Sequence, residues 1–317
     1  MNDLSKNKKW QVTIRWIGTL LSLALLIYLF FNTGIDEIVA ALKKLSLSKI
    51  ILVILLIFIS RIATFFRWHM LLQIETIKVH WKDSLRLTFA GLFAANFLPT
   101  TIGGDVVRLA GAMRVGISGT LAAASLMTDR LVGMAGMALA LPFGLPALFK
   151  FVDNRTLDKG RRVMVMLAFG KKLSYKLSSA IKKVIENFSY WLKHPKYLLL
   201  ALLFTFVHMS AIFLIIKVII SDLGEYMSFW QIAGIWSLTY FITLIPVSIN
   251  GLGLQEVTIT NLFSILGGLS NSTSITIAIV IRALWVIGSL PGAFFISGIL
   301  SGEKSLPVTE VSKDSIQ

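Results

Sequence analysis

The chain alternates between long apolar runs and short polar segments over most of its length. A helix that crosses the hydrocarbon core of a bilayer needs about 20 consecutive apolar residues. Runs of this kind predict spanning helices at 14–31, 50–66, 121–149, 197–220, 229–249 and 273–300. Shorter runs at 85–98 and 257–266 add two segments that are too short for an upright crossing. We therefore predict an all-α polytopic membrane protein with about seven or eight hydrophobic segments.

Two short segments break this pattern in a similar way. The first lies at 96–108, where Pro99 follows an apolar run, Gly103 and Gly104 form a glycine pair, and Asp105 opens a new apolar segment. An acidic residue suits the N-terminus of a helix, because the helix dipole is positive there. Asp105 also precedes an arginine by three residues, a spacing that places both side chains on one helix face.

The second break lies at 245–256, where Pro246, Gly251 and Gly253 precede Glu256. Within a bilayer, backbone that cannot form a helix must be buried in protein or line a wet cavity. Paired glycine- or proline-interrupted segments in the two halves of a membrane protein indicate a transport site. We therefore predict two re-entrant broken-helix regions.

Composition supports a membrane protein and excludes several chemistries. The chain is 56% hydrophobic and 15% charged, with a mean hydropathy of +0.78, and a soluble domain could not bury that much apolar surface. The absence of cysteine excludes disulfides, a thiol nucleophile and cysteine metal sites. The four histidines lack metal-binding spacing, and neither a GxxxxGK[ST] loop nor a complete dinucleotide motif occurs. We predict no metal and no cofactor.

The positive charge is concentrated in one segment. The net charge is +15, and residues 150–196 hold twelve lysines and arginines against three acidic residues, a local charge of +9. A basic juxtamembrane segment with an amphipathic helix at 171–192 predicts a cytoplasmic location facing anionic lipid. Nucleic acid is the alternative partner, but no nucleic-acid-binding motif accompanies the segment.

These charges also set the predicted domain organisation. Residues 1–13 are polar and carry three lysines, which predicts a cytoplasmic N-terminus before a retained first helix. Residues 14–300 form one transmembrane domain, and the polar residues 301–317 form a disordered tail. The predicted location is the cell membrane.

Six charged residues lie at membrane depth: Asp105, Arg108, Asp129, Arg130, Glu256 and Arg282. Six lipid-facing charges at roughly 2.5–3.5 kcal/mol each would cost roughly 15–20 kcal/mol, so they must meet one another, water or a ligand. One interpretation is a set of salt bridges that lock helices together. The other is a polar cavity in which arginines bind a phosphate and carboxylates hold a cationic head group or carry a proton.

Two more basic residues lie near the end of the span 50–66. Arg61 is one turn or so from that end, and we expect its long side chain to snorkel to the membrane surface. Arg67 and Trp68 follow, and we interpret them with His69 as a basic and aromatic boundary of the membrane.

Four pieces of sequence occur in a fixed order: Asn96-x-x-Pro99-x-x-x-Gly103-Gly104-Asp105-x-x-Arg108, Asp129-Arg130-x-x-Gly133, Pro246-x-Ser248-x-x-Gly251-Leu252-Gly253-x-x-Glu256, and Arg282. This ordered set resembles the lysylphosphatidylglycerol synthase transmembrane (flippase-like) family over roughly residues 10–300. The resemblance implies a prokaryotic membrane protein with broken helices around a lipid cavity. It also implies that Asn96 and the six charged residues bind substrate, while the prolines and glycines shape the broken helices.

The function expected from these observations is translocation of an anionic, aminoacylated or polyprenyl-linked phospholipid. A second hypothesis is an enzyme related to phosphatidylglycerol lysyltransferase, or an accessory subunit in lipid modification. The chain has no soluble aminoacyl-transferase domain, which argues against lysyl transfer by this chain alone. A third hypothesis is a membrane scaffold without transport. The expected partner is membrane phospholipid, with a homo-oligomer among the open options.

Overall fold

The described part of the chain is entirely helical. The computed structural model describes residues 43–73, 79–97, 103–147, 193–244 and 254–300, and these ranges contain no strand. In chain order the helices are α3 (Leu47–Leu72), α4 (Trp81–Ala95), α5 (Gly103–Arg114), α6 (Gly119–Ala140), the short 3₁₀ helix η1 (Leu141–Gly144), α9 (Pro195–Asp222), α10 (Phe229–Thr243), α11 (Leu254–Ile265), α12 (Asn271–Ser289) and α13 (Pro291–Leu300). The predicted all-α class is confirmed.

Four helical segments are long and apolar enough to cross a membrane: Leu47–Leu72, Gly119–Ala147, Pro195–Asp222 and Asn271–Ile296. They correspond to four of the predicted spans, and they make the chain a multi-pass membrane protein. The predicted span 14–31, most of the basic segment 150–196 with its amphipathic helix, and the tail 301–317 lie outside the described residues.

One predicted span is described only in part. The apolar run 229–249 contains α10, which covers Phe229–Thr243. A helix of 15 residues is about 22 Å long, shorter than the roughly 30 Å hydrocarbon core. The end of the run, 245–249, lies outside the described residues.

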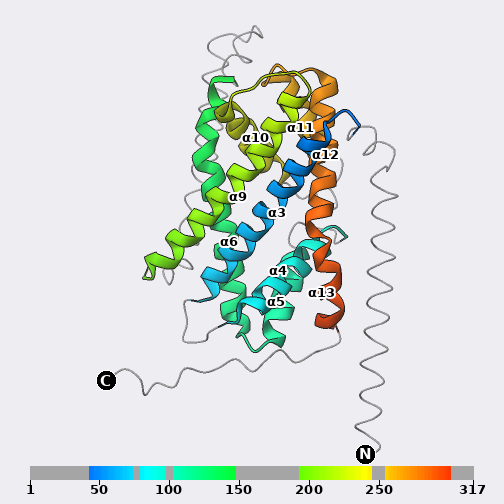
Figure 1. Cartoon of the computed structure of the whole chain (residues 1–317). Helices are drawn as coiled ribbons and strands as arrows, with labels where there is room; N and C mark the ends of the chain where they lie inside the picture. The colour runs from blue at the N-terminus through cyan, green and yellow to red at the C-terminus, as the bar shows by residue number, and fades with distance from the viewer. Residues whose placement is uncertain (1–42, 74–78, 98–102, 148–192, 245–253, 301–317) are drawn as a thin grey trace, which may run out of the picture.

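The short helices form two pairs at opposite ends of the long ones. Figure 1 places α4 and α5 at the lower end of α3 and α6, and α10 and α11 at the upper end of α9 and α12. Each pair flanks one predicted break, at 96–108 and 245–256, and the central residues 98–102 and 245–253 of these breaks lie outside the described ranges. The new helices begin at Gly103 and Leu254, close to the predicted restarts.

Serine caps and glycines fix the visible ends of these helices. Ser228 forms a capping box with Gln231 at the start of α10, and Ser270 accepts a hydrogen bond from the Thr273 amide at the start of α12. Gly224 and Gly268 have φ of +79° and +72°, just after α9 and α11. A left-handed residue after a helix satisfies the last carbonyls, and glycine adopts it without steric cost.

The upper loops are joined by one carboxylate. The amide and hydroxyl of Ser270 donate hydrogen bonds of 3.0 and 2.7 Å to Glu225. Hydrogen bonds from Thr273 and Ser270 hold the pKa of the Glu225 carboxyl below its usual 4.5. A lowered pKa means that the folded state prefers the charged carboxylate. This stabilisation is present above pH 4.5 and is lost as the pH falls through the folded pKa.

We therefore expect the melting temperature of the purified protein to fall below pH 4.5 more in the wild type than in Glu225→Gln. The effect is small, because Glu225 is only partly buried. The measurement is a pair of melting curves at stepped pH in the same detergent. Parallel pH profiles for the two proteins would contradict the role of Glu225.

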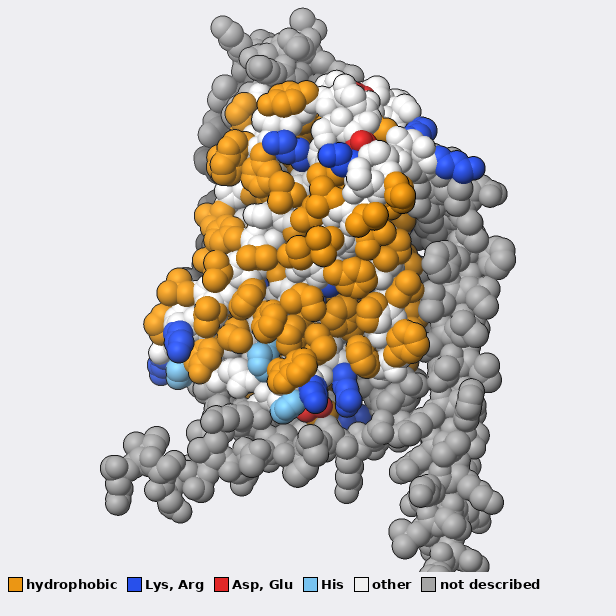
Figure 2. Space-filling view, viewed as in Figure 1, with side chains coloured by type: hydrophobic (Ala, Val, Ile, Leu, Met, Phe, Trp, Pro, Cys, Tyr) orange, Lys and Arg blue, Asp and Glu red, His pale blue; other side chains and the backbone are white. Residues whose placement is uncertain are grey.

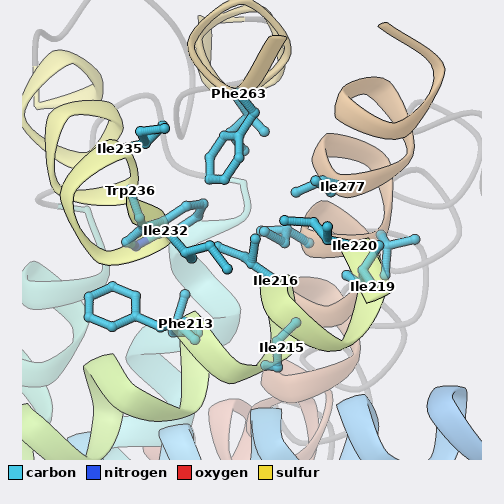
Figure 3. Packing of buried hydrophobic residues seen from close by; sticks show 14 of the residues in the cluster. Phe213, Ile215, Ile216, Ile219, Ile220, Ile232, Ile235, Trp236, Phe263 and Ile277 are labelled. Carbon is cyan, nitrogen blue, oxygen red and sulfur yellow. The ribbon is translucent and has the colours of Figure 1, made fainter. Parts of the chain in front are cut away.

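The largest core cluster lies in the upper half of the bundle. Phe213 and Ile216 of α9 meet Ile232 and Trp236 of α10, and Phe263 of α11 packs onto them (Figure 3). Lipid tails are as apolar as these side chains, so close van der Waals packing rather than water exclusion holds such a cluster together in a membrane. The cluster attaches the short helices α10 and α11 to the spanning helices α9 and α12.

The surface has the distribution expected of a membrane protein. Figure 2 shows hydrophobic side chains over the middle of the described surface, with charged and histidine side chains towards its two ends. Large apolar side chains such as Leu47, Ile51 and Leu55 of α3 are exposed. In a bilayer these residues face lipid, so their exposure carries no penalty.

Candidate functional site

Five charged residues from three helices form one charged cluster: Arg67 of α3, Asp105 and Arg108 of α5, and Asp129 and Arg130 of α6. Arg67 Nε lies 2.6 Å from Asp129 Oδ1. Arg108 Nη1 lies 3.2 Å from both Asp105 Oδ1 and Asp129 Oδ2, and Arg130 pairs with Asp105. The cluster therefore joins α3, α5 and α6 through a continuous chain of ion pairs.

The cluster is buried unevenly. The side chains of Asp129 and Arg108 are 4% and 9% exposed, whereas the side chain of Arg130 is 35% exposed. Asp129 lies ten residues inside α6, about 15 Å along the helix axis from its N-terminus. The most buried carboxylate thus lies deep in the bundle, and Arg130 provides its most accessible cation.

Arg108 is held by an aromatic ring as well as by carboxylates. Its guanidinium carbon lies 4.1 Å from the centre of the Trp68 ring, and Trp68 Nε1 donates a 3.1 Å hydrogen bond to Ser125. This hydrogen bond holds the Trp68 ring in the orientation on which the Arg108 guanidinium stacks. Even so, Arg108 Nε and Nη2 are buried and have no hydrogen-bond partner in the described part of the chain. The charged cluster therefore has unused hydrogen-bond donors among the described residues and a net charge of +1.

Close backbone contacts position the start of α5. A Cβ on Gly104 would lie 2.5 Å from the Gly91 carbonyl oxygen, and a Cβ on Gly91 would lie 2.6 Å from Arg108 Cγ. Only glycine lets α4 and α5 approach this closely and leaves room for the arginine. Gly103 and Gly104, predicted to shape the break, lie at the first two positions of α5.

Gly104→Ala should lower the melting temperature by roughly 2–10 °C, because overpacking costs about 1–3 kcal/mol and the obstructing atom is backbone. Gly119→Ala is the matched control, since its new Cβ would meet only the end of the flexible Met113 side chain at 3.4 Å. Thermal unfolding in detergent measures both. Equal melting temperatures for the two variants would mean that α4 and α5 tolerate separation.

A second ion pair lies in the other half of the molecule. Arg282 of α12 pairs with Glu256, which is in the first turn of α11. The Arg282 side chain is 6% exposed and that of Glu256 is 27% exposed. We call Glu256 and Arg282 the second pair. It repeats the arrangement of Asp105: an acid near the start of a short helix faces an arginine on a neighbouring helix.

Asn96 lies apart from these charges. Its amide nitrogen donates a 2.8 Å hydrogen bond to Ser289 Oγ of α12 and a 3.1 Å bond to the Phe93 carbonyl. It thus ties the end of α4 to the end of α12. The structure does not bring Asn96 into the charged cluster, and its role in substrate binding stays a prediction. Pro99, Pro246, Gly251 and Gly253 lie outside the described residues.

Two arginines of α3 differ from their predicted positions. Arg61 does not snorkel to the surface: it is 7% exposed and its guanidinium carbon lies 5.6 Å from the centre of the Trp285 ring. Arg67 is not only a boundary residue, because it pairs with Asp129. Both side chains lie against helix glycines, since a Cβ on Gly133 or Gly288 would come within 3.2 or 3.1 Å of them. The contact between Gly133 and Arg67 joins two helices that are far apart in the sequence, so no local pattern indicated it.

The family model for the lysylphosphatidylglycerol synthase TM region matches residues 15–170 and 154–292. The two matches together span most of the chain and contain every residue of the charged cluster and of the second pair. A search of curated proteins found no match.

Proposed function

We propose that this chain, which belongs to the lysylphosphatidylglycerol synthase TM region family, moves an anionic, aminoacylated or polyprenyl-linked phospholipid across the membrane. One observation carries the proposal: the charged cluster combines a surplus positive charge with buried Arg108 donors that have no acceptor among the described residues. A phosphodiester has two non-bridging oxygens, and the two parallel N–H groups of a guanidinium can donate to both of them.

The residues of the charged cluster would have different roles in binding the lipid head group. Arg108 and Arg130 would bind the lipid phosphate, and Arg130 would meet it first because it is the more exposed. Once Arg130 turns to the phosphate, Asp105 is able to accept the ammonium group of an aminoacylated head group. Asp129 stays between its two arginines and keeps them in place. In the other half, Arg282 and Glu256 would repeat these two roles.

The broken helices supply the path in this proposal. Pro99 and the pair Gly103 and Gly104 interrupt one apolar run, and Pro246, with Gly251 and Gly253, interrupts the other. Re-entrant turns at these breaks would leave free amide groups and open space at mid-membrane, where a head group must pass. Apolar tails would stay in the bilayer beside the exposed side chains.

The proposal also predicts which charged segments face the cytoplasm. The lysines in 1–13 and the basic segment 150–196 would lie on the cytoplasmic side of the cell membrane, in contact with anionic lipid. In Figure 1, α6 runs upward towards residue 147 and α9 begins at the lower end, so the described ends of that segment lie at opposite ends of the bundle and do not assign either end to the cytoplasm.

The test is lipid scrambling in vesicles that contain the purified full chain. Labelled phosphatidylglycerol and its lysyl form are the candidate substrates. We expect Asp105→Asn and Glu256→Gln to slow transfer by about 10–100-fold, since a hydrogen bond to a charged group contributes about 1.5–3 kcal/mol. Both substitutions keep an acceptor oxygen for the arginines, so the variants should stay folded. Lys217→Met, which removes an exposed charge from α9, is the control.

The remaining hypotheses predict different results in the same vesicles. An enzyme that modifies head groups would change the chemical composition of the lipid, which mass spectrometry of the extracted lipid detects. A scaffold would leave both composition and leaflet distribution unchanged, although the protein is folded. Transfer by the wild type that is equal in Asp105→Asn would contradict the role given to the charged cluster.

A further inference from the structure

Arg61 is a buried cation that no carboxylate neutralises in the described part of the chain. It lies near the middle of α3, is 7% exposed, and its Nε is buried without a hydrogen-bond partner. The arginines of the charged cluster and the second pair all have an acidic partner. Arg61 has instead the face of an aromatic ring.

A second unsatisfied donor lies on that ring. The guanidinium carbon of Arg61 is 5.6 Å from the centre of the Trp285 ring, and Trp285 Nε1 is buried without a hydrogen-bond partner among the described residues. Gly288, one turn further along α12, leaves the space that the arginine occupies, since a Cβ there would lie 3.1 Å from Arg61 Nε. Two hydrogen-bond donors from two helices therefore lie close together and have no acceptor in the part of the chain that the structure describes.

This arrangement is costly unless an anion completes it. A buried charge without a partner destabilises a fold, and an apolar residue of similar size would pack with less penalty. Stacking on Trp285 attracts the cation but supplies no acceptor for its N–H groups. A phosphate ester would accept the two N–H groups of the Arg61 fork on its two non-bridging oxygens, and one of these oxygens can also accept the indole N–H.

We infer that Arg61 and Trp285 form an anion site that binds a phosphate ester group at the middle of the bundle. The inference rests on the proposed function and adds to it a binding station between its two charged regions. Along α3, Arg67 of the charged cluster is six residues away, about 9 Å of axial distance. Along α12, Arg282 of the second pair lies one helical turn from Trp285.

The position of Arg61 suggests what the anion site does in transfer. A phosphate that leaves the charged cluster would need another cation on its way to Arg282, because an ionised group without a partner inside the membrane is strongly disfavoured. Arg61 has no carboxylate partner among the described residues, so it can accept the phosphate and release it without first breaking an ion pair.

The test uses the purified full chain in detergent and compares wild type with Arg61→Met, Arg61→Lys and Trp285→Phe. Phosphatidylglycerol, phosphatidylcholine or sodium phosphate is added, and the melting temperature is recorded. We expect phosphatidylglycerol to raise the melting temperature of wild type, with this shift lost in Arg61→Met and reduced in Arg61→Lys and Trp285→Phe. Lys217→Met, an exposed cation on α9, should keep the full shift.

The protein without added lipid gives a second readout. Methionine removes the unsatisfied charge, so Arg61→Met should melt at or above the wild-type temperature before lipid is added. A purely structural arginine predicts the reverse: a lower melting temperature in Arg61→Met with an unchanged lipid shift, which would overturn the inference. A shift of equal size with sodium phosphate would support the anion site and identify a free anion, rather than a lipid, as its occupant.

Transfer in vesicles separates the two proposals. We expect Arg61→Met to slow phosphatidylglycerol transfer at least tenfold, while Lys217→Met transfers at the wild-type rate. If wild type transfers no lipid, the proposed function fails, and the lipid-dependent melting shift still decides whether Arg61 binds the anion. If wild type and Arg61→Met transfer equally well and show equal shifts, the anion site fails alone.

Discussion

Asp129→Asn should lower the melting temperature of the purified protein by roughly 10 °C. Removal of one partner from a buried ion pair costs about 3–5 kcal/mol, and 1 kcal/mol corresponds to roughly 2–4 °C in chains somewhat shorter than this one. Asp129 is the most buried carboxylate of the charged cluster and contacts two arginines, Arg67 at 2.6 Å and Arg108 at 3.2 Å. The substitution leaves both cations buried, and Arg67 loses the carboxylate that it contacts.

Asp105→Asn is the matched comparison, because Asp105 also pairs with two arginines. Its cost should be less than half as large. Arg108 keeps Asp129 in that variant, and Arg130, 35% exposed, can be hydrated. Asp83→Asn on α4 removes a carboxylate that forms no ion pair within the described ranges, and should leave the melting temperature unchanged. A similar shift for all three variants would mean that general charge, rather than the buried network, sets stability.

A double substitution tests whether the network acts as a unit. Arg67→Gln should cost less than Asp129→Asn, because Asp129 keeps Arg108 when Arg67 is gone. Once Asp129 is absent, removal of Arg67 relieves repulsion between two buried cations. The double variant should therefore melt at or above Asp129→Asn, and the two effects should not add. Strict additivity would show that Arg67 and Asp129 are not coupled.

Much of the architecture was predictable because hydrophobic length and helix-breaking residues are local properties. Four spanning helices follow from apolar runs, and the restarts at Gly103 and Leu254 follow from glycine and an acid within the first turn. The end of α10 at Thr243 lies just before the second predicted break, where Pro246 cannot continue a helix.

The site was half predictable for a related reason. Charged residues inside apolar runs are easy to find in a sequence, so six of the seven residues that form the charged cluster and the second pair were predicted, and Arg67 was missed. Arg61 and Arg67 lie near the end of the predicted span 50–66, where an arginine ordinarily reaches water, whereas α3 extends to Leu72. Their burial results from glycines on other helices, Gly288 and Gly133, that make room for them. Contacts between distant segments of the chain decide whether such an arginine is buried, and a single sequence does not show those contacts.

Variants of the second pair distinguish an ion pair that only holds two helices together from one that also binds lipid. Glu256→Arg alone places two cations together, and Arg282→Glu alone places two acids together, so each single variant should be strongly destabilised. The double variant restores an opposite pair, and we expect it to recover most of the lost melting temperature. Recovery should be incomplete, since an arginine in the first turn of α11 opposes the helix dipole by about 0.3–1 kcal/mol.

Transport should not recover with stability in the double variant. The arginine would then lie on the short helix α11 and the carboxylate on α12, so a lipid phosphate would meet a negative charge where Arg282 had been. We expect transfer of phosphatidylglycerol to stay about 10–100-fold below wild type, as for the loss of a charged hydrogen bond. If the exchanged pair restores transfer and melting temperature together, Glu256 and Arg282 only hold α11 to α12. The lipid phosphate would then have to be bound by the charged cluster and Arg61 alone.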